Sequence, residues 1–160
     1  MINYPFKSVI PFGFFIFFTT SLWSQLTVNG TSLFVDSATH LKVDGHIFID
    51  KNASLTAKGI LAVSGNVESI SINDQIDNLQ IFGDLPGKIN FLKGNINHLF
   101  LLKSLSVPTY LQGVSLAVSN LHFVNNYNLL TLNDTDLDIV NLSDFSDVNY
   151  IVTNGKGLVG

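Results

Sequence analysis

The chain has 160 residues, of which 46% are hydrophobic and 12% are charged, and its formal net charge is −4. This length suits a single domain with one continuous core. The 8 basic residues form no cluster, which excludes a groove for nucleic acid, and the absence of Cys excludes disulfides, thiolate catalysis and Cys-ligated zinc.

The polar residues point to an all-β protein. Asn, Ser, Thr and Asp supply most of them, whereas Arg is absent and Glu occurs once, at Glu68. Long helices usually carry Glu, Lys and Arg on their solvent face. Turns and short strands suit this composition better.

The N-terminus has the layout of a secretory signal peptide. Lys7 precedes the apolar run VIPFGFFIFFTTSL at residues 9–22. This run has about 14 residues, whereas a transmembrane helix needs roughly 20. We therefore predict a signal peptide helix at residues 1–24 and a mature chain at residues 25–160, secreted or on the cell surface. The membrane contact would be transient, through this peptide and the secretion machinery, and an uncleaved N-terminal anchor is the alternative.

A repeat follows the signal peptide. Rows of fourteen residues read SLFVDSATHLKVDG (32–45), HIFIDKNASLTAKG (46–59) and ILAVSGNVESISIN (60–73). Each row holds two apolar-x-apolar segments, and in the third row Ile70 and Ile72 form the second segment. The period then changes to about ten, in the segments NLQIF (78–82), KINFL (88–92) and HLFLL (98–102).

Stacked rows would form a single-domain parallel β-solenoid. Equivalent side chains of successive rows would lie about 4.8 Å apart and share one core. This register predicts that Leu33 stacks on Ile47, and Ile47 on Leu61. An antiparallel meander is the alternative, with turns at Asn29-Gly30 and Asp44-Gly45.

Four segments carry a resemblance to a known class of protein: LTVNGTSLFV (26–35), GILAVSGNV (59–67), NLLTLNDTDLDIVNL (128–142) and YIVTNGKGLVG (150–160). The chain resembles the non-enzymatic β-solenoid regions of large secreted and surface proteins of Bacteroidetes, many of which carry a C-terminal sorting domain for type IX secretion. The resemblance implies an exported structural or adhesive module, with cell-surface polysaccharide or further domains of a longer protein as partners. The sorting domain is absent here, so we expect the solenoid to be truncated at its C-terminus.

Two carboxylates are the candidate metal ligands. In the fourteen-residue register Asp36 and Asp50 stack roughly 5 Å apart, a spacing that fits a Ca²⁺ site or a retaining glycosidase pair. A solvated Asp ladder is the alternative interpretation. The glycosidase interpretation gives a second functional hypothesis, a carbohydrate-active β-helix that binds or cleaves polysaccharide. The DTDLD segment at 134–138 lacks the Gly and Glu of a calcium loop, and strand alternation explains it.

Two aromatic residues are the candidate binding strip. Phe34 and Phe48 lie between inward positions, so alternation turns both outward, followed by Ala62. Such a strip could stack against sugar rings or a neighbouring domain, unless a flanking segment buries it.

No His pair has zinc-binding spacing, and we expect the four histidines at turns or on the surface. No nucleophile motif occurs either, so the sequence predicts a protein that is not an enzyme and has no cofactor.

Overall fold

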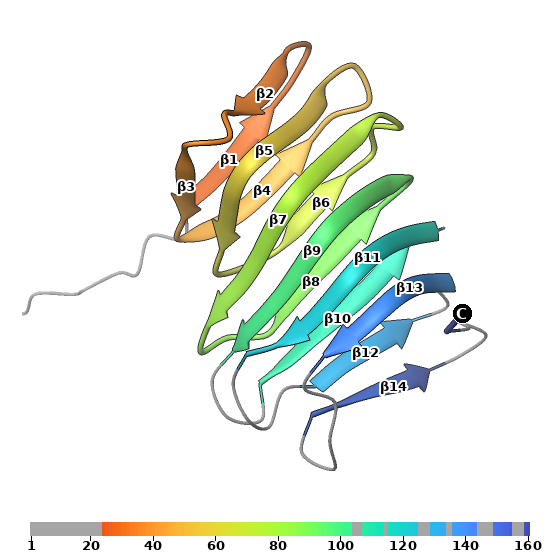
Figure 1. Ribbon diagram of the computed structural model, residues 1–160. Helices are drawn as coiled ribbons and strands as arrows, with labels where there is room; N and C mark the ends of the chain where they lie inside the picture. Colours follow the sequence, from red (N-terminus) through yellow and green to blue (C-terminus); the bar gives the residue numbers. More distant parts are fainter. Residues whose placement is uncertain are drawn as a thin grey trace, which may run out of the picture.

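The computed structural model describes residues 24–103, 107–113, 115–124, 129–133, 136–143, 149–154 and 159–160. These residues form parallel strands that wind as a β-solenoid, so the predicted fold class is confirmed. Figure 1 shows the strands stacked from β1 at one end to β14 at the other. The predicted signal peptide lies outside the described residues except for Ser24, which begins β1.

The strands belong to two sheets, and each coil of the solenoid contributes one strand or strand pair to each sheet. Sheet A contains β1 (Ser24–Val28), β4 (Gly45–Ile49), β6 (Val67–Ser69), β8 (Gly87–Phe91), β10 (Pro108–Gly113), β12 (Leu129–Asn133) and β14 (Tyr150–Asn154). Sheet B contains β2 (Ser32–Val35), β3 (His40–Val43), β5 (Ser54–Val63), β7 (Asp74–Gly83), β9 (Gly94–Lys103), β11 (Ser115–Phe123) and β13 (Asp136–Ser143).

A coil contains three apolar-x-apolar segments rather than two. In the first coil the second and third segments are separate strands, β2 and β3, and both pair with the long strand β5. In later coils these segments merge into one strand of sheet B. Its pairing skips one position at the middle, as between Ile76 and Asn78 of β7 opposite β9. Each long strand therefore covers two faces of the coil.

The register shows that the predicted fourteen-residue row is wrong. Residues that are register partners in neighbouring coils lie 18 to 22 positions apart. Leu33 pairs with Leu55 in sheet B, whereas Ile47 pairs with Leu26 and Val67 in sheet A. The predicted stacking of Leu33, Ile47 and Leu61 is therefore wrong, because Ile47 lies in the opposite sheet from the other two. The later period of ten is half a coil: NLQIF stacks on HLFLL, and KINFL lies in sheet A.

The core lies between the sheets and consists of aliphatic columns that run through the coils. One column is formed by Leu41, Leu61, Leu79, Leu99 and Leu121. The last four of these residues are fully buried. Complete burial of a Leu side chain contributes about 1.5–3 kcal/mol. These columns and the parallel ladders hold together a chain that has no Cys.

Polar residues take several buried places in the third coil. Ile70 and Ile72, which were predicted to form a strand, are 43% and 60% exposed in the connection after β6. Ser69 and Asp74 are buried instead. The Asp74 carboxylate accepts hydrogen bonds from the Leu55 backbone N–H at 2.9 Å and from the Ser69 hydroxyl. The predicted strand at Ile70 and Ile72 is therefore wrong. Alternation assigns core positions to apolar residues, but polar residues can occupy them when their side chains form hydrogen bonds.

A buried lysine ties three coils together at one corner. Lys103 ends β9, and its side chain turns inward with the residue fully buried. The Nζ atom donates to the backbone carbonyls of Ser64, Phe82 and Leu85 at 2.8, 2.7 and 2.7 Å. Burial lowers the pKa of Lys103 to about 8, and the charge of Asp84 opposes this change.

Candidate functional site

The outer face of sheet B carries polar side chains in rows. Residues that alternate with the core columns point to solvent, and the skipped position in β7 and β9 places two successive residues outward. In β9 these are Asn97 and His98. Their counterparts are Asp77 and Asn78 in β7. Because the strands are parallel and in register, similar side chains repeat at the strand spacing of about 4.8 Å.

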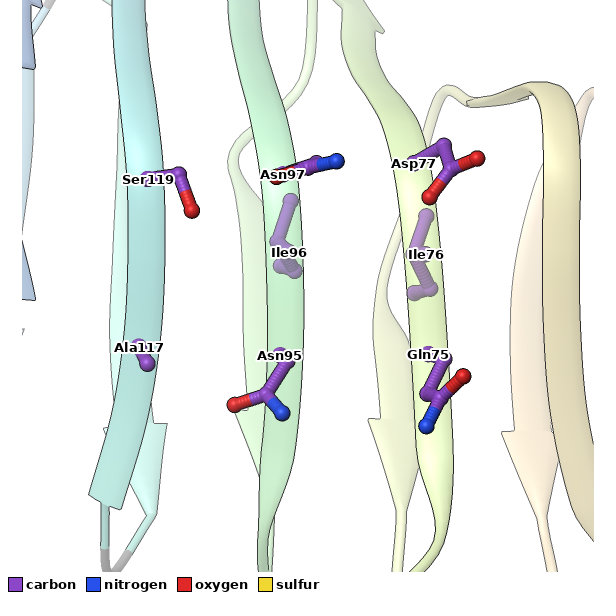
Figure 2. A pocket seen from close by; sticks show the side chains of 8 residues that line it. All are labelled: Gln75, Ile76, Asp77, Asn95, Ile96, Asn97, Ala117 and Ser119. Carbon is purple, nitrogen blue, oxygen red and sulfur yellow. The ribbon is translucent and has the colours of Figure 1, made fainter.

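A shallow trough of about 230 Å³ crosses three of these strands. Figure 2 shows its walls as two rows of side chains. One row contains Gln75, Asn95 and Ala117, and the other contains Asp77, Asn97 and Ser119. The strand backbone at Ile76 and Ile96 forms the floor, because both side chains are buried in the core. The trough thus runs across the strands, parallel to the solenoid axis.

The walls of the trough are rich in groups that both donate and accept hydrogen bonds. Side-chain amides have two N–H donors and a carbonyl acceptor, and hydroxyls can act in either role. Of the described residues that line the trough, Asp77 is the charged one and is partly exposed. The arrangement is suited to a ligand rich in hydroxyl or amide groups.

An asparagine ladder borders the trough. The side-chain amide of Asn141 donates to the Asn120 carbonyl oxygen at 3.0 Å, and the Asn120 amide donates to the Asn97 backbone carbonyl at 3.1 Å. These bonds run from β13 through β11 to β9, across the strands.

Two histidines meet beside this ladder. His98 Nδ1 lies 3.2 Å from His122 Nε2, and His122 Nδ1 lies 2.8 Å from the Ser143 hydroxyl. Phe100 stacks on His122, with ring centroids 4.5 Å apart and an interplanar angle of 11°. The Ser143 hydroxyl donates to the Leu121 carbonyl at 3.4 Å. That donation fits a chain of bonds in which His98 donates to His122 and His122 donates to Ser143.

This histidine pair was not predicted from the sequence. The histidines were expected at turns or on the surface, and 24 positions separate His98 from His122. Knowledge of the coil register would have placed His98 and His122 on adjacent strands. The order Ser143, His122, His98 also resembles a nucleophile, a base and an orienting residue. In the chain of bonds described above, however, His122 donates to Ser143 and the Ser143 hydroxyl donates to the Leu121 carbonyl, whereas a base that activates a nucleophile accepts the proton of its hydroxyl.

The structure separates the two predicted metal ligands. Asp36 follows β2 of sheet B, and its carbonyl accepts a hydrogen bond from the Thr39 N–H at 2.9 Å. Asp50 follows β4 of sheet A, and its carbonyl accepts one from Ala53 at 3.0 Å. Each residue begins a turn. The predicted Asp36–Asp50 ladder is therefore wrong, because it depended on the fourteen-residue row. Among the described residues, no group of three or more His, Asp or Glu side chains could hold a metal ion.

The predicted aromatic strip is wrong for the same reason. Phe34 is 57% exposed on sheet B, where its register partner is Thr56, and Lys58 Nζ lies 6.0 Å from its ring centroid. Phe48 lies on sheet A, half-buried between Thr27 and Glu68. The two rings are thus on opposite sheets. Ala62, expected to continue the strip, is buried.

A second hollow surrounds Phe48 on sheet A. It has a volume of about 210 Å³ and is also lined by Gln25, His46, Asn66 and Glu68. The Asn66 backbone N–H donates to His46 Nδ1 at 2.9 Å, and the Asn66 side-chain amide donates to Glu68 at 3.1 Å. Lys88 Nζ lies 3.7 Å from the same carboxylate. Most of these polar groups are already engaged with one another, so the trough on sheet B is the stronger candidate.

The DTDLD segment is only partly described. Residues 134–135 lie outside the described residues. Leu137 is buried and Asp138 is exposed, as strand alternation predicts.

Comparisons with known proteins gave no relative. No family model, no curated protein and no solved structure matches the chain. Within the described ranges, no helix is long and apolar enough to cross a membrane.

Proposed function

We propose that the protein is an exported, non-catalytic structural or adhesive module of a secreted or cell-surface protein. The observation that carries this proposal is the outer face of sheet B, where hydrogen-bonding side chains repeat from coil to coil around the trough. Repetition gives many equivalent weak contacts, and such contacts add up when they act together. That property suits adhesion to a repetitive surface.

The same face supports binding rather than cleavage. Glycoside hydrolysis needs two carboxyl groups about 5–10 Å apart. Asp36 and Asp50 were the candidate pair, and they lie in the turns after strands of different sheets. Within the described lining of the trough, Asp77 has no second carboxylate beside it. We therefore propose cell-surface polysaccharide as a partner that the protein binds and does not cleave.

Export is supported by the sequence of residues 1–24, with the short basic start and the apolar run already described. Further domains of a longer protein are the other class of partner, since stacked coils can act as a spacer. In either role the module works outside the cytoplasm. The module needs no cofactor for this function.

Cell fractionation followed by an adhesion assay tests the proposal. We expect the chain in the medium or on the cell surface, cleaved near Ser24, and we expect the purified exported chain to sediment with isolated cell envelopes. A mature chain that stays in the cytoplasm would refute export. Release of reducing sugar ends from envelope polysaccharide, abolished by Asp77→Asn, would refute the non-catalytic assignment.

A further inference from the structure

We infer that the trough on sheet B binds an extended, uncharged polysaccharide that lies along the solenoid axis with one sugar residue on each coil. This inference rests on the proposed adhesive function and names the ligand class. The residues concerned are those of the two walls in Figure 2.

The direction of the trough requires a linear ligand that crosses the strands. Its walls draw on β7, β9 and β11, which are successive neighbours in sheet B. In each row, equivalent positions of adjacent strands follow one another, as Gln75 and Asn95 do in the register. A ligand that follows the trough therefore meets a new set of side chains at every strand.

The spacing of the strands selects the class of polymer. Neighbouring strands are about 4.8 Å apart, so binding groups recur at that interval. An extended chain of β-linked sugars repeats at nearly this distance per residue. An extended peptide advances only about 3.3 Å per residue, so its side chains fall out of step with the coils. The trough thus favours a polysaccharide over a peptide.

The width and the chemistry of the walls indicate how a sugar would bind. The two walls are formed by residues two positions apart on one strand, such as Asn95 and Asn97. The Cα atoms of such residues are roughly 6.6 Å apart, and this distance sets the width of the trough. This width admits a sugar ring by its edge, where the hydroxyl groups lie. The amides of both walls can donate to a hydroxyl oxygen and accept its proton. Edge-on binding needs no aromatic platform.

The charge of the trough excludes acidic polymers. Asp77 is the charged residue of the described lining, and the whole chain has a formal net charge of −4. A uronic acid or sulfated polymer would be repelled by this carboxylate and by the general field of the protein. A polymer with a cation on every sugar is not matched either, because the described lining offers one carboxylate for it to pair with, so the matching ligand is neutral.

Calorimetric titration of the purified exported chain tests the inference. The probes are neutral β-1,4-linked glucose oligomers of two to six sugars, with oligogalacturonate of equal length as the acidic comparison. We expect affinity to rise with length until about three or four sugars, because the trough crosses three strands, and then to level off. Asn95→Ala and Asn97→Ala should each weaken binding about tenfold. The matched control is Asn90→Ala, an amide on the outer side of sheet A, which should bind as the unmodified chain does.

The inference would be overturned by equal affinity for all lengths, by tighter binding of the acidic oligomer, or by an equal loss in the Asn90 control. If the chain adheres to cell envelopes but binds no neutral oligomer, the ligand class is wrong and the adhesive function stands. If it binds the oligomers in the trough but adheres to no envelope, the adhesive function is wrong and the binding site stands.

Discussion

Replacement of Lys103 by Met removes the ammonium that joins three coils at one corner. The side chain of Met has a similar length but gives no N–H donor to the carbonyls of Ser64, Phe82 and Leu85. Hydrogen bonds that involve a charged group contribute about 1.5–3 kcal/mol each. Simple addition of the three bonds would give roughly 6 kcal/mol.

The cost of burying the charge opposes this contribution. Burial lowers the pKa of Lys103 from 10.5 to about 8. The pKa change compares the charged with the neutral side chain in the folded protein, so it already includes the hydrogen bonds of the ammonium and is not subtracted from them. Because the three bonds share one ammonium, their contributions do not simply add. Lys103→Met should therefore lower the free energy of unfolding by about 3 kcal/mol at pH 7.

The pH dependence of stability provides a second test of the same residue. Between pH 8 and 10.5 the unfolded chain keeps the Lys103 proton while the folded chain loses it. The unfolded state then binds more protons, so Lys103 makes the free energy of unfolding rise with pH, by up to about 1.4 kcal/mol per pH unit. Below pH 8 both states are protonated, and this contribution is flat. The deficit of Lys103→Met should therefore widen by roughly 3 kcal/mol from pH 8 to 10.5.

Urea denaturation followed by circular dichroism at pH 7, 8, 9 and 10 measures both effects. Lys93→Met, at an exposed lysine, is the control and should match the unmodified chain at every pH. The reasoning would be refuted by a deficit that stays constant across this range, or by a variant as stable as the unmodified chain at pH 7.

Substitutions at three further positions test the core and a turn. Asp74→Ala removes the acceptor of two buried hydrogen bonds and should lower the free energy of unfolding by about 2 kcal/mol, whereas Asp74→Asn should cost less; equal losses in urea denaturation would contradict this role. Leu99→Ala opens a cavity in a fully buried column and should cost about 3 kcal/mol, and a thermal midpoint within a degree of the original would contradict the stacking. Gly59→Ala places a Cβ atom 2.2 Å from two carbonyl oxygens of the β2–β3 turn, so amide hydrogen exchange in β2 and β3 should accelerate while β9 stays protected.

Alternation along the chain predicted core-facing residues correctly in the first two coils, although it failed at Ile70 and Ile72. Val35, Val43, Ile49 and Leu55 were expected inward, and all four are buried. The composition also favoured strands over helices, and the described residues contain no helix. These predictions succeeded because they depend on the chain's local geometry, in which side chains point to opposite faces with a period of two.

The stacking partners could not be predicted in the same way. The segments at Leu33 and Leu41 resemble those at Ile47 and Leu55, but the first two lie in sheet B, and Ile47 lies in sheet A. The stacking partner of a segment depends on the positions at which the chain turns from one sheet to the other. The alternation of apolar residues does not reveal these positions. The Asp36–Asp50 pair and the Phe34–Phe48 strip were both predicted from the fourteen-residue row, and both predictions are wrong because the row is wrong. The trough was missed for the same reason.

The bonds of Lys103 have a mechanical consequence for a chain pulled by its two ends. Coils of a parallel solenoid can peel away one after another, because each coil contacts only its neighbours. The Lys103 ammonium reaches from the end of β9 to the corners after β5 and β7, so its bonds cross two coil boundaries. Tension that arrives at this corner has to rupture both boundaries together, and unravelling from either end should pause there.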